Sequence, residues 1–219
     1  MEDWRARKRA ATRRGIREQA LRLFLEKGFA ETTVEEIVAA AGVSHMTFFR
    51  YFKTKEDAAV GGGEGLGYGF GFVGGEEGGD EFDVMLGELL AARPVGEPVV
   101  EKFRHALVGE LGRMFVDDGD GMLVRARFVL GTPALRGRLW DGQEVTRRRV
   151  GGVLARVEGV DPGDLGLQVA VAACLATALA AVRIWVEGGG IAALPDVVDA
   201  AFRALGGGMG SHHPGGGGF

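Results

Sequence analysis

Only one cysteine, Cys174, occurs among the 219 residues of the chain. A single thiol cannot form an internal disulfide, so nothing in the composition indicates secretion. The first fourteen residues are charged and contain no apolar run, which argues against a secretory signal peptide. We therefore expect a cytoplasmic protein.

The motifs of common enzymes are also missing, since no Gly-x-Ser-x-Gly, His-Glu-x-x-His or phosphate-loop lysine pattern occurs. The glycine pattern at 69–74 has no strand before it and no helix after it, so it does not predict dinucleotide binding. His212 and His213 lie in a glycine-rich tail, and the aspartates at 117–120 lack the downstream glutamate of a calcium loop. The sequence predicts no enzyme, no cofactor and no metal site.

The net charge is only −4, but it is unevenly distributed along the chain. Residues 1–57 carry a net charge of +3, whereas the remainder carries −7. This asymmetry is typical of a basic module that faces DNA and is attached to an acidic body.

Alternating strand patterns are absent, whereas apolar residues recur at helical spacing along most of the chain. Between residues 61 and 79, however, 11 of 19 residues are glycine. Each glycine costs a helix about 1 kcal/mol relative to alanine, so we expect a flexible insertion there. The sequence predicts an all-α fold with helices over residues 5–27, 33–41, 44–52, 55 onward, 82–92, 98–117, 122–130, 133–157, 165–186 and 194–205.

Two of the short helices are expected to form a helix-turn-helix. Thr33 and Glu36 have the spacing of a capping box at the start of the first helix. Gly42 ends that helix, and Ser44 can cap the next one. Two helices joined by such a short glycine-containing turn are characteristic of this DNA-binding motif.

The segment Thr33–Glu56 closely resembles the DNA-binding signature of TetR-family regulators. The shared pattern is a threonine, an acidic-Ile pair, Ala-Gly-Val-Ser, a second threonine, Tyr-Phe and Lys-Glu. Phe49 departs from it, because many members carry a tyrosine there that reaches a phosphate. The resemblance implies a helix-turn-helix DNA-binding domain (1–57), a linking region with the insertion (58–81), a helical effector-binding and dimerisation domain (82–205) and a disordered tail (206–219).

In the docking mode of this family the recognition helix enters the major groove of operator DNA. His45 and Met46 are then expected to read base edges, with Thr47 close by. Their neighbours would hold phosphates, with Arg50 compensating for the missing hydroxyl of residue 49. The expected DNA-binding residues are Thr33, Ser44, His45, Met46, Thr47, Phe49, Arg50, Tyr51, Lys53 and Lys55.

Several of these residues have an alternative interpretation that involves no contact with DNA. His45 is alternatively a solvated helix residue, and Lys53 and Lys55 an ordinary solvated end. Residues 5–14 form either a basic arm that reaches the minor groove or a frayed terminus.

Family members dimerise through their last two long helices, and residues 165–186 fit this role. Small residues there allow close helix approach, namely Gly166, Ala170, Ala173, Ala176 and Ala180. The segment is long enough to span a bilayer, but Gln168 and Arg183 interrupt it. We therefore expect a homodimer without a membrane partner.

The middle helices in this family enclose a small-molecule effector pocket. The large apolar residues that are candidates for its lining, each of which is otherwise an ordinary core residue, are Phe103, Leu107, Met114, Phe115, Phe128, Trp140 and Trp185. The stretch 125–138 resembles actinobacterial members related to the mycofactocin-cluster regulator, whose ligands are acyl-CoA thioesters. An arginine of this stretch would then face the phosphates, unless the arginines form a solvated face; the four are Arg125, Arg127, Arg136 and Arg138.

The resemblance implies a transcriptional regulator that an effector releases from a palindromic operator, and the usual behaviour of the family makes it a repressor. Two alternatives stay open: a DNA-binding dimer without an effector response, and a helical small-molecule-binding module without DNA function. The insertion either loops out of a helix that resumes near Phe82 or softens the coupling between the two domains.

Overall fold

The computed structural model describes residues 2–60 and 79–207, and the regular structure in these ranges is entirely α-helical. The all-α prediction is therefore confirmed. The flexible insertion expected over 61–79 and the disordered tail expected over 206–219 lie mostly outside the described residues. The helices are α1 (Glu2–Lys27), α2 (Val34–Ala41), α3 (His45–Tyr51), α4 (Lys55–Val60), α5 (Gly79–Ala91), α6 (Val99–Gly131), α7 (Pro133–Glu158), α8 (Leu165–Glu187) and α9 (Leu194–Gly206).

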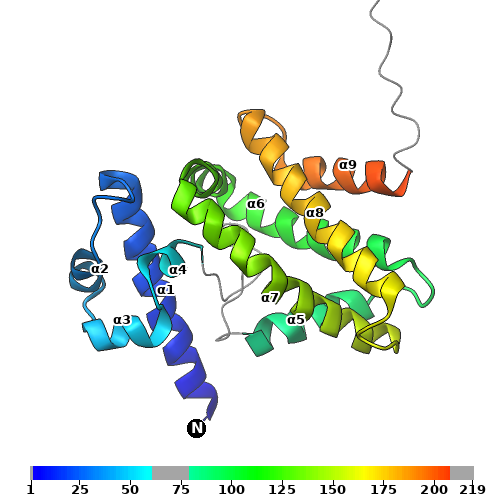
Figure 1. The fold of residues 1–219 in the computed structure, drawn as a ribbon, viewed down its shortest axis with the longest axis horizontal. Helices are drawn as coiled ribbons and strands as arrows, with labels where there is room; N and C mark the ends of the chain where they lie inside the picture. Colours follow the sequence, from blue (N-terminus) through cyan, green and yellow to red (C-terminus); the bar gives the residue numbers. More distant parts are fainter. Residues whose placement is uncertain (1, 61–78, 208–219) are drawn as a thin grey trace, which may run out of the picture.

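Helices α1–α4 form a small head, and α5–α9 form a larger body beside it (Figure 1). The head is built around large apolar residues that are almost completely buried: Ile16, Phe24, Ile37, Phe48 and Phe52. These residues come from α1, α2, α3 and the residue that follows α3. Their common burial, driven by the hydrophobic effect, fixes the angle at which the helix-turn-helix crosses α1.

The predicted caps form as expected at the ends of α2 and α3. The Thr33 hydroxyl accepts a hydrogen bond from the Glu36 amide (3.2 Å), and the Glu36 carboxylate accepts one from the Thr33 amide (3.0 Å). Gly42 ends α2 with a φ of +64°, a left-handed conformation that favours glycine. The Ser44 hydroxyl accepts from the Thr47 amide (3.1 Å) and so starts α3.

The body is organised around α8, which packs against α6, α7 and α9. Cys174 on α8 is completely buried, and burial raises the pKa of its thiol to about 12. Cys174 is therefore a small buried apolar residue of the core.

The break predicted between residues 117 and 122 is confirmed. The two helices expected over 98–117 and 122–130 form the two halves of α6, which meet at Asp118, where the backbone is not helical (φ −157°, ψ 55°). The helix resumes because the Asp118 carboxylate accepts a hydrogen bond from the Gly121 amide (3.1 Å), as an N-cap does. The residues around Asp118 therefore separate the two halves at a kink, without a loop between them.

The α6–α7 corner joins the body to the head. Val129 at the end of α6 and Leu135 at the start of α7 are buried in the apolar core of the head, with Phe128 packed against it. Helix α4 also packs against α7, and Figure 1 shows this end of the body beside the head. The two parts therefore share one continuous packed interface.

Candidate nucleic-acid interface

The recognition helix α3 separates its apolar and exposed side chains. Phe48 is fully buried, whereas Met46 is 83% exposed and Phe49 is 53% exposed. His45 is exposed beside Met46 at the start of the helix, and Thr47 is half-buried. The side chains predicted to read bases thus lie together on the outer face of α3.

An acidic residue that sequence reasoning overlooked lies next to His45. The Glu35 carboxylate of α2 is 3.5 Å from His45 Nε2. Hydrogen bonds from the backbone of Glu35 and from the Thr33 side chain, together with the charge of His45, lower the pKa of this carboxyl. Residues 35 and 45 meet only because α2 and α3 cross here, so no local sequence signal could have revealed the pair.

The end of α3 carries a cluster of polar and cationic groups. The Arg50 guanidinium lies 5.0 Å from the centre of the Tyr51 ring, and its Nη2 donates to the Tyr51 hydroxyl at 3.4 Å. Arg50 and Lys53 are exposed, and Tyr51 is half-buried. Such groups are suited to phosphate contacts, which position a protein on DNA without reading its sequence.

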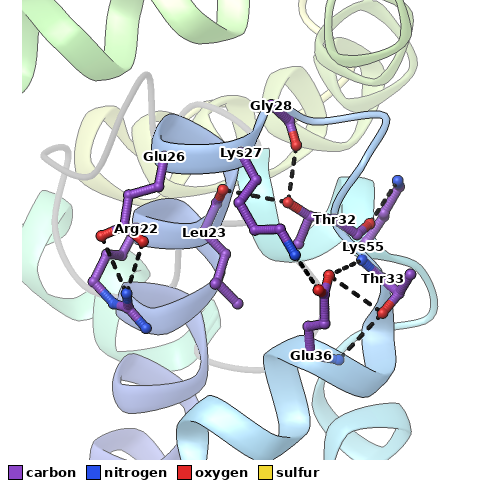
Figure 2. Close-up of polar contacts among 9 residues, drawn as sticks. All are labelled: Arg22, Leu23, Glu26, Lys27, Gly28, Thr32, Thr33, Glu36 and Lys55. Atoms are coloured by element: carbon purple, nitrogen blue, oxygen red, sulfur yellow. Dashed lines mark hydrogen bonds and ion pairs between the residues drawn. The ribbon is translucent and has the colours of Figure 1, made fainter.

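Lys55 is placed differently from what the family resemblance implies. Its ammonium group donates to the main-chain carbonyls of Phe29 (2.8 Å), Ala30 (3.3 Å) and Thr32 (2.9 Å) in the α1–α2 loop. Figure 2 shows Lys55 beside Thr32, close to the capping contacts of Thr33 and Glu36. The group expected to contact a phosphate is therefore bound to the protein's own backbone.

Residues 5–14 are part of α1, so they form neither an extended arm nor a frayed end in this structure. Their side chains are largely exposed along the helix. Lys8 Nζ lies 5.1 Å from the centre of the Trp4 ring, a cation–π contact on the helix surface. The basic surface of the head thus includes the first turns of α1.

The candidate pocket residues separate into two places. Phe103, Leu107 and Trp185 are almost completely buried in the apolar core of the body, and Met114 and Phe115 pack against it. Phe115 and Trp185 form a T-shaped pair with ring centres 6.2 Å apart. The side chain of Trp140 lies outside the described residues.

Phe128, expected in the pocket, lies instead at the joint between body and head. Its ring stacks on Phe24 of α1 at 5.9 Å and lies 6.3 Å from Phe29 in the α1–α2 loop. Sequence spacing could not distinguish these positions, because Phe128 is an ordinary member of the apolar pattern of α6.

Three of the arginines expected near an effector phosphate contact the protein itself. Arg125 pairs with Asp118 (2.8 Å), Arg127 donates to the Gly189 carbonyl (3.1 Å), and Arg136 donates to the Leu130 carbonyl (2.8 Å). The side chain of the fourth, Arg138, lies outside the described residues. These contacts restrain the kink of α6, the α8–α9 loop and the α6–α7 corner.

Helix α8 leaves one apolar side uncovered. Its exposed residues Leu165, Val169, Ala172, Ala176, Ala180 and Ile184, here called the α8 stripe, recur every three or four positions. By length and composition α8 is the helix of the described chain that could cross a membrane, and 44% of its most apolar window is buried within the chain. The small residues in the middle of the stripe allow another helix to approach closely.

Comparisons with known proteins agree with this division into head and body. Residues 16–57 match the model for bacterial regulatory proteins of the tetR family, and residues 97–210 match the model for the MftR C-terminal domain. The regulator TcmR of Streptomyces glaucescens is 34% identical over 167 residues, which cover 73% of this chain and 66% of TcmR. The mycofactocin biosynthesis transcriptional regulator MftR of Mycobacterium tuberculosis is 26% identical over 207 residues, 93% of each chain.

A solved structure shares the fold over nearly the whole length. FadR of Thermus thermophilus, a TetR-family transcriptional repressor solved in complex with lauroyl-CoA, has a TM-score of 0.53 and 24% sequence identity. The match covers 94% of this chain and 100% of the other. At this level of identity the likeness supports the arrangement of helices alone.

Proposed function

This chain belongs to the TetR family of bacterial regulatory proteins, and we propose that it is a homodimeric repressor released from a palindromic operator by a hydrophobic effector. Its relatives are DNA-binding transcriptional regulators and not enzymes. The observation that carries the proposal is the outer face of α3, where His45, Met46 and Phe49 are exposed above a buried Phe48. We place this activity in the cytoplasm, where the operator is accessible.

In this proposal the start of α3 enters the major groove. His45 reads a base edge by hydrogen bonding, and Met46 makes apolar contact, for example with a thymine methyl group. Thr47 lies close to the bases, while Ser44 holds the first turn of α3 in place. Five other residues face the DNA backbone and set the register of the protein on the duplex, namely Thr33, Phe49, Arg50, Tyr51 and Lys53.

The α8 stripe supports the dimer. A contiguous apolar face of this kind is unusual on a monomer and is suited to packing against a second copy. Two recognition helices related by a twofold axis would then contact half-sites about one helical turn, roughly 34–36 Å, apart. This geometry requires a palindromic operator.

The body supports a response to a hydrophobic effector. One apolar region of the body gathers Phe103, Leu107, Met114, Phe115 and Trp185, and α6 carries residues of this region as well as Val129, which is buried in the core of the head. An effector that binds only one arrangement of this region shifts the dimer toward that arrangement. The lauroyl-CoA bound by the Thermus protein makes acyl-CoA thioesters the class of effector to test first.

A second candidate is a DNA-binding dimer without an effector response. The nearly complete burial of Phe103, Leu107 and Trp185 favours it, because these side chains already fill a closed core. The two candidates make the same prediction for DNA and differ only in the effect of added ligands.

Selection of bound sequences from random duplex DNA, at two salt concentrations, tests the proposal. We expect a palindrome whose affinity falls steeply with salt. Acyl-CoAs of increasing chain length are then added to the complex with this palindrome, with free coenzyme A as the matched control. Release by a thioester but not by coenzyme A supports the repressor, while binding that no thioester affects supports the second candidate. Binding without any preferred sequence contradicts both.

A further inference from the structure

The three N–H groups of the Lys55 ammonium converge on three backbone carbonyls in the α1–α2 loop, those of Phe29, Ala30 and Thr32. The ammonium also lies 4.6 Å from the centre of the Phe29 ring. Lys55 is half-buried, unlike the exposed Lys53 two residues earlier. A compact cation with three donors is suited to such a site, because every donor finds a partner.

The loop that Lys55 holds sets the start of the helix-turn-helix. Thr32 is fully buried, and its hydroxyl lies 2.8 Å from the Gly28 carbonyl and 3.3 Å from that of Leu23, near the end of α1. Thr33 then caps α2, and Lys27 of α1 pairs with Glu36 of the same cap. Figure 2 shows these contacts around the loop. The position of α2 relative to α1 therefore depends on a few residues that Lys55 binds directly.

The same loop also contacts the body. The Phe29 ring contacts the Lys55 ammonium and also lies 5.1 Å from the ring of Phe24 and 6.3 Å from that of Phe128. A side chain that fixes this loop consequently fixes both the start of α2 and the surface against which α6 packs.

We propose that Lys55 is a positioning residue of the head, which ties the α1–α2 loop to the start of α4 and so sets the angle of the helix-turn-helix, and that it does not bind a DNA phosphate. Contact with a phosphate would require the ammonium to leave carbonyls at 2.8 and 2.9 Å. The inference rests on the proposed DNA-binding function, because its effect is measured as operator affinity.

The test measures operator affinity of the full-length protein at several salt concentrations for the wild type, Lys55→Met and the matched variant Lys53→Met. Each lysine that neutralises a phosphate contributes about 0.9 to the slope of log K against log salt. We expect Lys53→Met to reduce this slope by about 1.8, because the dimer loses one phosphate contact in each half-site. Lys55→Met leaves the slope unchanged and lowers affinity by about tenfold at every salt concentration.

A third variant, Lys55→Arg, separates the two roles without removing the charge. Arginine binds phosphate as well as lysine does or better, so a phosphate role predicts that affinity is retained. A positioning role predicts a loss of affinity, because a planar guanidinium cannot direct three donors to the same converging carbonyls. This variant also carries the test if Lys55→Met does not fold.

Hydrogen exchange of the same proteins provides a second measurement. Positioning predicts faster exchange of the backbone amides in residues 29–37 of the Lys55 variants, and unchanged exchange in α8. A slope reduced by about 1.8 in Lys55→Met, full affinity of Lys55→Arg, or faster exchange spread evenly over α1–α4 would each overturn the inference. If the wild type selects no operator, the proposed function fails, and the exchange pattern still decides whether Lys55 holds the loop.

Discussion

Neighbouring residues in the head have different tasks although they share one short sequence motif. Phe48 is buried while Met46 and Phe49 are exposed on the same helix. Lys53 is exposed, whereas Lys55 is bound to backbone carbonyls. Residue type alone therefore does not identify the groups that contact DNA.

At this scale we predict that His45→Ala lowers operator affinity at particular base pairs. A good base contact contributes about 1–3 kcal/mol of discrimination, so the loss should be concentrated at one position in each half-site. The measurement is binding to a set of operators with single base-pair substitutions, and Lys53→Ala is the control with a uniform loss. An equal loss on every sequence would assign His45 to the DNA backbone.

A second prediction concerns the pH dependence of the α2 cap. Hydrogen bonds from the Lys27 side chain and from the Thr33 backbone lower the pKa of Glu36 below its ordinary value of 4.5. A carboxyl with a lowered folded pKa stabilises the fold above its unfolded pKa, and this contribution is lost as pH falls through the folded pKa. Urea unfolding should therefore show Glu36→Gln to be less stable than the wild type at pH 7, with a smaller difference at pH 3. If the difference in unfolding free energy between Glu36→Gln and the wild type does not change with pH, it does not come from the ionised Glu36 carboxylate.

At the scale of helices, periodicity predicted where most elements begin and end. Helices α2, α3, α7, α8 and α9 lie where the apolar spacing and the caps placed them. The break predicted within α6 is present at Asp118, whose carboxylate caps the second half. Local spacing thus located this break as well.

A buried ion pair between α6 and α7 provides a test at this scale. Lys102 Nζ lies 2.7 Å from the Glu158 carboxylate, and their side chains are 5% and 20% exposed. Glu158→Gln leaves a buried ammonium without its partner and should destabilise the protein by about 3 kcal/mol. Lys102→Met leaves a carboxylate that water still reaches, so we expect a smaller loss of about 1 kcal/mol. Urea unfolding of both variants checks the order, and the reverse order would contradict the argument.

The joint between the head and the body supports another prediction. Phe128→Ala removes the ring that stacks on Phe24, and we expect a loss of about 2–3 kcal/mol, below the range for fully buried phenylalanines. Because this ring bridges the two parts, the variant should also lower operator affinity. Phe103→Ala, in the core of the body, is the control that destabilises the protein without touching the head. If the two variants bind the operator equally well under conditions where both are folded, the loss of the Phe128 ring does not alter DNA binding by the head.

At the scale of the whole molecule, a basic head is attached to an acidic body with an uncovered apolar face. The net charge of +3 in residues 1–57 draws the head toward DNA, while the −7 of the remainder is repelled by it. Association through the α8 stripe would therefore place two heads on the DNA and keep the acidic bodies away from it.

The prediction at this scale is that Ala176→Arg, in the middle of the α8 stripe, yields a folded monomer with strongly reduced operator affinity. Ala176 is exposed in the single chain, so the arginine should leave the fold intact while two charges meet at the twofold interface. Sedimentation and operator binding are measured together, with Ala91→Arg at the exposed end of α5 as the matched control. A dimeric Ala176→Arg would place the interface elsewhere.

The sequence alone determined the helices, the caps of the helix-turn-helix and the family, because these depend on local spacing and on residues that are close along the chain. The assignment of His45 and Met46 to the start of the recognition helix came from the family resemblance. Only the tertiary structure decided which residues from distant segments meet, such as Lys55 with the α1–α2 loop, Glu35 with His45 and Phe128 with Phe24. These contacts depend on the angles at which helices cross, and those angles are set by the packing of the whole core and not by any local pattern.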